Sequence, residues 1–241
     1  MTLAPLFEAV DATWPAASRT PVGPWILRDG QGGGKRVSAT SATNVAQPSD
    51  IPVAEAAMTT RGQSLLFTLR PEDREIDAAL ADRGYGVVDP TNIWLAPIAR
   101  LTDVPVPRVT AFCIWEPLAI MEEIWAKGGI GPARLDVMAR AGEKTGILAR
   151  WNERPAGAAF AALHEEICMV HAVEILPEQR RQGVASWVMR AAAFWAQARG
   201  AQQISVLCTQ ANTGANRLYS SLGFETVGQY HYRQKDAQKV P

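Results

Sequence analysis

The residues best suited to chemistry lie in the segment Ile-Leu-Pro-Glu-Gln-Arg-Arg-Gln-Gly-Val-Ala at 175–185. The apolar run before it predicts a strand, and an apolar stripe with i, i+3, i+4 spacing over 183–199 predicts a helix. The first N–H groups of a helix lack partners within the helix and carry partial positive charge. Gly183 lets the backbone approach a ligand, while Arg180 and Arg181 add charge. This segment therefore predicts an anion site suited to a pyrophosphate.

Three titratable residues accompany this segment. His171 and Glu174 lie on the predicted strand, and Tyr219 lies on a later helix. An imidazole near neutrality, or a carboxylate acting through water, can remove a proton from an ammonium group, and a phenol with a pKa of about 10 can protonate a leaving group of similar basicity. The alternative roles are structural: a core histidine, an arginine partner and a core aromatic ring. Strand alternation predicts His171, Val173 and Ile175 on one face and Ala172 and Glu174 on the other.

Two motifs in order carry a resemblance to a known family. The first is R-x-x-G-x-A at 180–185, and the second is N-x-x-A-x-x-L-Y-x-x-L-G-F at 212–224. With the predicted strands and helices around them, the two motifs resemble the acetyl-CoA signature of the GCN5-related N-acetyltransferases, the GNAT superfamily. This resemblance covers about residues 105–241.

The resemblance implies an α/β (α+β) fold with a mixed, strongly twisted sheet flanked by helices. The strand ending at Ile175 would splay from the strand over 204–208, with the pantetheine arm of acetyl-CoA in the gap. The backbone of Val173 and Ile175 would pair with the pantetheine amides, Asn212 would lie near the cofactor arm, and Tyr219 would reach the thioester sulfur. Wrapping of the pyrophosphate is implied for Arg181, Gln182, Gly183, Val184, Ala185 and Ser186, with Arg180 at the first motif position.

The predicted function is an N-acetyltransferase that moves acetyl from acetyl-CoA, a cosubstrate, directly to the primary amine of a small molecule. Tyr219 is the candidate acid, and the base stays open between His171, Glu174 and water. Two alternatives also stay open. The acceptor could be a protein N-terminus or lysine, or the chain could be a catalytically silent acyl-CoA-binding module.

Composition excludes several other classes. The chain has 241 residues, with 24 Lys plus Arg against 24 Asp plus Glu, so no net field attracts nucleic acid or an anionic membrane. No apolar stretch reaches the roughly 20 residues that span a bilayer, and the N-terminus lacks a secretory pattern, which predicts a cytoplasmic protein. Cysteines at 113, 168 and 208 have no metal-ligand spacing, which favours buried, reduced thiols over a disulfide or a metal site. A homodimer is an open alternative to a monomer.

A proline-containing segment over 101–108 predicts a stiff linker and a boundary near residue 104. Residues 105–241 would form the GNAT acetyltransferase domain. Its predicted helices cover 115–127, 132–140, 183–199 and 213–222, and its predicted strands cover 145–151, 156–163, 167–176, 204–208 and 224–232.

Residues 1–104 would form a smaller, degenerate GNAT-like domain. Segment 65–85 echoes segment 204–224 in strand, helix, glycine and aromatic residue, but has Asp73 and Leu80 where the later copy has Asn212 and Tyr219. If Asn212 and Tyr219 do chemistry, the first copy cannot perform the same chemistry. The role of its Gly30–Gly34 loop, as a turn or as a ligand contact, stays open. Further elements are predicted at 3–14 and 71–84 as helices and at 24–28, 35–40, 64–70 and 85–98 as strands.

Overall fold

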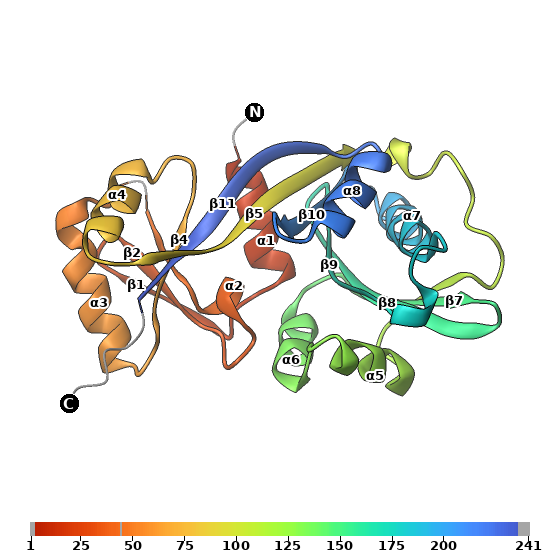
Figure 1. The fold of residues 1–241 in the computed structure, drawn as a ribbon, viewed down its shortest axis with the longest axis horizontal. Helices are drawn as coiled ribbons and strands as arrows, with labels where there is room; N and C mark the ends of the chain where they lie inside the picture. The colour runs from red at the N-terminus through yellow and green to blue at the C-terminus, as the bar shows by residue number, and fades with distance from the viewer. Residues whose placement is uncertain (1–2, 44, 236–241) are drawn as a thin grey trace. The chain divides into compact units, whose positions relative to one another are not determined.

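The computed structural model describes residues 3–43 and 45–235 and forms two compact units (Figure 1). Unit 1 contains the chain up to Pro15 together with Ile93–Cys208 and Asn212–Val227, and unit 2 contains Ala16–Asn92, Thr209–Ala211 and the chain from Gly228 onward. This division differs from the predicted boundary near residue 104. The N-terminal helix and residues 93–104 group with the C-terminal segment.

Unit 1 is built on a mixed sheet with the strand order β5-β10-β9-β8-β7-β6. Strands β6 to β9 are successively antiparallel, and β9 and β10 are parallel. This is the mixed α/β sheet that the resemblance implied. Its elements are α1 (Ala4–Thr13), β5 (Gly86–Pro97, in part), β6 (Ala111–Ile114), α5 (Ala119–Lys127), α6 (Pro132–Arg140), β7 (Lys144–Trp151), β8 (Arg154–His164), β9 (Ile167–Ile175), α7 (Val184–Gln197), β10 (Gln203–Thr209), α8 (Thr213–Ser221) and β11 (Glu225–Lys235, in part).

Small residues on β8 let helices pack closely on both faces of this sheet. The segment Ala158–Ala162 is fully buried, and its only large side chain is Phe160. Ala159 and Ala161 join the core beneath α7, whereas Phe160 contacts Trp14 at the end of α1. Successive strand residues face opposite sides. Helix α7 therefore covers one face of the sheet, and α1 covers the other.

Unit 2 has the strand order β1-β2-β3-β4-β11, with its core around Trp25, Phe67 and Leu80. Strands β4 and β11 are antiparallel, pairing Leu65–Leu69 with His231–Lys235. The elements are β1 (Ser18–Val22), β2 (Trp25–Asp29), α2 (Lys35–Ser38), β3 (Thr40–Ala42), α3 (Ile51–Thr60), β4 (Leu65–Leu69), α4 (Arg74–Asp82) and the remaining parts of β5 and β11.

The internal echo has a counterpart in backbone geometry. Gly84, with φ +82°, follows the C-cap of α4, and Gly223, with φ +81°, follows the C-cap of α8. Each glycine adopts the left-handed conformation that commonly ends a helix. The amide of the following aromatic residue donates back into the helix in both copies, from Tyr85 to Leu80 O at 3.0 Å and from Phe224 to Tyr219 O at 3.1 Å.

Several predictions of local structure and burial also differ from the structure. The predicted strand over 35–40 is the short helix α2 followed by β3. The predicted helix over 115–127 starts at Ala119 after the unpredicted strand β6, because Pro117 disfavours helical conformation in the residue before it. Helix α4 begins at Arg74 rather than at Pro71. Cys113 is exposed, because it lies on the edge strand β6.

Within the described ranges, no helix is both long enough and apolar enough to cross a membrane.

Candidate active site

Strands β9 and β10 lie side by side over only part of their length. Their parallel register joins Ile167–Val170 to Gln203–Val206 and goes no further in the described chain, although β9 continues to Ile175 and β10 to Thr209. Strand β9 keeps its other neighbour, because Gly157 of β8 still lies opposite Ile175. Residues 171–175 therefore present an edge that is not paired to β10. This divergence agrees with the splay that the resemblance implied.

A β-bulge interrupts β9 where this edge begins. Ala172 has φ +51°, and the register with β8 shifts by one residue between the pairs Phe160–His171 and Ala158–Glu174. The predicted alternation is wrong at this point, because an inserted residue reverses which side chains share a face. Val173 and Ile175 pack on the α7 side of the sheet, whereas His171 contacts Trp14 on the α1 side.

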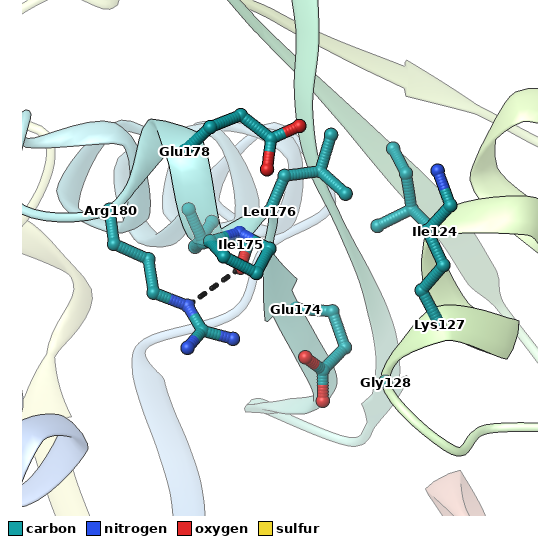
Figure 2. Close-up of a pocket in the computed structure, with 9 residues that line it drawn as sticks. Ile124, Lys127, Gly128, Glu174, Ile175, Leu176, Glu178 and Arg180 are labelled. Carbon is teal, nitrogen blue, oxygen red and sulfur yellow. Dashed lines mark hydrogen bonds between the residues drawn. The ribbon is translucent and has the colours of Figure 1, made fainter.

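Glu174 reaches a pocket formed by the end of α5 and the end of β9 (Figure 2). The pocket has a volume of about 340 Å³. The Glu174 carboxylate points toward Gly128, whereas the Glu178 carboxylate lies on the opposite side of Ile175 and Leu176 (Figure 2). The lining is largely apolar, with two carboxylates and two cations at its edges, and consists of Ile124, Lys127, Gly128, Glu174, Ile175, Leu176, Pro177, Glu178 and Arg180.

The environment of Glu174 suits a proton acceptor. Burial raises the pKa of this half-buried carboxyl above its ordinary value, while the nearby charges of Arg180 and Arg134 lower it by less. A raised pKa brings a carboxylate closer to the basicity that proton removal near neutral pH requires. Glu174 can therefore act as a base from within the pocket.

The predicted anion site forms a turn between β9 and α7. Arg181 has φ +63° and Gly183 has φ +80°, and a Cβ atom built on Gly183 meets no atom within 4 Å. In the part of the chain that the structure describes, no backbone carbonyl accepts a hydrogen bond from the amides of residues 181–185. These amides and the start of a 14-residue helix make a donor-rich site for an anion.

The side chains around this turn differ in exposure. Arg180 and Gln182 are exposed and bind back to the protein. Arg180 Nε donates to Ile175 O at 2.9 Å (Figure 2). Gln182 Nε2 donates to Glu178 O at 3.0 Å. Val184 is buried beneath the helix start, whereas Ala185 and Ser186 are partly exposed. The Ile175 carbonyl therefore already has one partner on the edge predicted to pair with pantetheine.

His171 lies apart from this pocket, in the core. It is 3% exposed, and its ring lies 5.0 Å from Trp14 and 6.2 Å from Phe160 between centroids. Its Nε2 lies 2.9 Å from Thr13 Oγ1, whose hydroxyl donates to Ala9 O at 2.6 Å. Because that hydroxyl proton is already used, Nε2–H is the donor to Thr13. In this geometry the His171 ring packs in the core against Trp14 and Phe160.

Tyr219 lies on α8 and is buried, whereas Asn212 lies at the N-cap of this helix and is exposed. Tyr219 is 4% exposed, and burial raises its pKa, with the Cys208 thiol adding to the shift. Its hydroxyl has no hydrogen-bond partner among the residues described, and the raised pKa keeps it protonated at neutral pH. Asn212 is exposed and caps the helix, since its Oδ1 accepts from the Ala215 amide at 3.1 Å.

The segment that contains this site matches a known protein family. Residues 114–224 match the family model described as Acetyltransferase (GNAT) family. Residues 114–224 are a GNAT-family domain. The GNAT family consists of acyltransferases, and its members use acetyl-CoA as the acyl donor.

One relative and two solved structures match this chain over most of its length. The uncharacterized N-acetyltransferase YobR of Bacillus subtilis (strain 168) is 25% identical over 245 residues, which cover 93% of this chain and 95% of YobR. A GCN5-related N-acetyltransferase from Kribbella flavida shares the fold, with a TM-score of 0.72, 18% identity and coverage of 98% and 96%. A tandem GNAT protein from the clavulanic acid biosynthesis pathway also shares it, with a TM-score of 0.61, 11% identity and coverage of 94% and 86%.

Two residues at the site were not predicted as functional. Trp125 is fully buried and donates from Nε1 to Ala172 O at 2.9 Å. Gly128 lies against the Glu174 side chain. In the sequence, Trp125 belongs to an amphipathic pattern and Gly128 to a glycine pair that separates two helices, so neither carries a signal for a role at the site.

Proposed function

We propose that this protein transfers the acetyl group of acetyl-CoA directly to the primary amine of a small molecule. The observation that carries this proposal is the divergence of β9 from β10 between the Gly183 turn and the Glu174 pocket. One continuous stretch of chain thus presents an anion site, an unpaired strand edge and a carboxylate.

The residues present fit acetyl-CoA at three points. The free amides of residues 181–185 suit the pyrophosphate, with Arg180 and Arg181 at the rim. The backbone of Val173 and Ile175 suits the pantetheine amides, because a strand edge can pair with an extended ligand. Asn212 caps the helix that holds Tyr219, and in this proposal it lies near the cofactor arm. When bound, the thioester supplies an acyl carbon open to attack.

The chain supplies the proton transfers. Glu174 accepts a proton from the acceptor's ammonium group, directly or through one water, so that the free amine can form the new N–C bond. Tyr219 donates its hydroxyl proton to the sulfur as the C–S bond breaks. The nitrogen of the new amide releases its second proton to solvent, and Tyr219 recovers a proton from solvent. His171, buried against Thr13 and Trp14, serves the packing of α1 on the sheet in this proposal.

The size of the pocket supports a small acceptor. A volume of about 340 Å³ lies in the range of small-molecule sites. Its largely apolar lining with a few charged groups also suits an amine of limited size rather than an extended peptide.

The test is release of free CoA thiol from acetyl-CoA by the purified protein with a panel of small amines, an N-terminal peptide and a lysine peptide. We expect turnover on a small amine, a loss of about 10²- to 10⁴-fold in Glu174→Gln, and loss of the acid limb of kcat/KM against pH in that variant. Turnover on peptides alone would make the acceptor a protein amine. Tight acetyl-CoA binding without turnover on any amine would instead make the chain a silent binding module.

A further inference from the structure

The end of α5 holds the strand that carries Glu174 at two points. The buried Trp125 donates from Nε1 to Ala172 O at 2.9 Å. Three residues later, Gly128 lies at the end of the helix against the Glu174 side chain. Residues three apart share one face of a helix, so both contacts reach β9 from the same side.

The Trp125 contact acts on the bulge. Ala172 is a non-glycine residue in the left-handed region, which is disfavoured unless its surroundings hold it there. The indole N–H gives its carbonyl a partner. Because the bulge reverses the alternation, Glu174 lies on the face of the sheet that α5 covers rather than on the α7 side, where Val173 and Ile175 pack.

The Gly128 contact acts on the carboxyl group itself. A Cβ atom at this position would lie 2.4 Å from Glu174 Cδ and 2.7 Å from both Cγ and Oε2. The backbone does not need glycine here, since φ is −83°, which any residue adopts. The absence of a side chain therefore provides the space in which the carboxyl group rests.

We propose that Trp125 and Gly128 are positioning residues that fix where the Glu174 carboxylate meets the acceptor amine. This inference rests on the proposed role of Glu174 as the base. The charged groups that face this carboxylate or share its pocket are Lys127 on α5, Arg134 on α6, and Glu178 and Arg180 after β9. None of these is altered by the substitutions that test the inference.

Gly128→Ala is the sharpest test. The three atoms nearest to the added methyl group all belong to the flexible Glu174 side chain, so the variant should fold with an unchanged unfolding temperature and bind acetyl-CoA within about twofold of the wild type. The displaced carboxylate should lower kcat/KM by about 10²-fold, the loss that a misplacement of about 1 Å can cause. Movement toward water should also shift the acid limb of the pH profile to lower pH, because solvation favours the charged form.

Gly142→Ala is the matched control, because its Cβ would meet no atom within 4 Å and its φ is not positive. It should behave as the wild type in every measurement. Trp125→Phe keeps an aromatic ring and removes the donor together with part of the buried indole volume. Apart from any loss of stability, it should move the acid limb in the same direction as Gly128→Ala.

The Glu174→Gln background separates the positioning role of Gly128 from the base role of Glu174. There, Gly128→Ala should cause less than about a twofold further loss, because residues that act through one group are not additive. An undiminished loss in that background, or a wild-type pH profile for Gly128→Ala alone, would overturn the positioning role. Wild-type activity of Glu174→Gln would overturn the proposed base instead, and the positioning role with it.

Discussion

Replacement of Gly183 by alanine tests the anion site most directly. Gly183 has φ +80°, and a Cβ atom there would meet no atom within 4 Å. The methyl group therefore clashes with nothing in the free protein. The cost to folding is the left-handed conformation alone, about 1–2 kcal/mol, which lowers the unfolding temperature by roughly 2–8 °C for a chain of this size.

The cost to binding should be larger if a pyrophosphate rests on this turn. A methyl group between Gly183 and the ligand breaks at least one hydrogen bond to a charged oxygen, worth about 1.5–3 kcal/mol. The Kd for acetyl-CoA should then rise about ten- to hundredfold. Isothermal titration calorimetry with acetyl-CoA measures this change, and a thermal unfolding scan measures the folding cost separately.

Gly200 provides the control at the other end of α7. It has φ +87°, and a Cβ atom there would also meet no atom within 4 Å, so Gly200→Ala carries the same backbone strain. We expect its acetyl-CoA affinity to match the wild type. Equal affinities in the two variants would refute the placement of the pyrophosphate at the α7 start.

Three further outcomes follow from the side-chain contacts. Tyr219→Phe should lower turnover with acetyl-CoA affinity unchanged, because it removes only the donor to sulfur; unchanged turnover in a thiol-release assay would exclude this acid. Thr13→Val should cost about 1–3 kcal/mol of stability in denaturant unfolding, because it removes the buried hydrogen bond between Thr13 Oγ1 and the His171 ring; a shifted pH profile of activity would instead mark His171 as the base. Partial burial raises the pKa of Asp77, but hydrogen bonds from Arg233 and His231 outweigh burial and lower that pKa below its ordinary value. The ionised carboxylate therefore stabilises the fold at pH 7. Asp77→Asn should destabilise the protein at pH 7 by an amount that shrinks as the pH falls below about 4. A pH-independent difference in unfolding temperature would contradict this last assignment.

The succession of elements over 144–224 was predictable because its signals are local. Apolar stripes and strand runs set the helices and strands, and Gly223 ends α8 in the left-handed conformation expected of a helix-terminal glycine. The anion site could also be predicted from local sequence, because the first amides of a helix lack partners within the helix and Gly183 precedes this helix.

The bulge at Ala172 was not predictable in this way. Alternation assumes regular pairing, and the extra residue depends on the register with β8 and on the Trp125 indole, both distant in sequence. The proposed roles of Glu174 and His171 depend on this bulge. Both now lie on one face of β9, but Glu174 reaches a pocket and His171 reaches the core.

In the first hundred residues, one local signal is ambiguous. The segment after Gly34 has strand-forming residues, yet its first four positions form a helical turn. A four-residue helix has too few positions to show a period, so sequence alone could not separate it from a strand.

Strands β5 and β11 each cross between the two compact units along the chain. The last residues of β5, from Ile93, belong to unit 1, and the last residues of β11, from Gly228, belong to unit 2. A gene fragment encoding residues 105–241 alone would leave β10 without its neighbour β5, and one encoding 1–104 would leave β4 without β11. Deletion of either half would therefore open the sheet of the other, because each half completes its sheet with a strand from its neighbour.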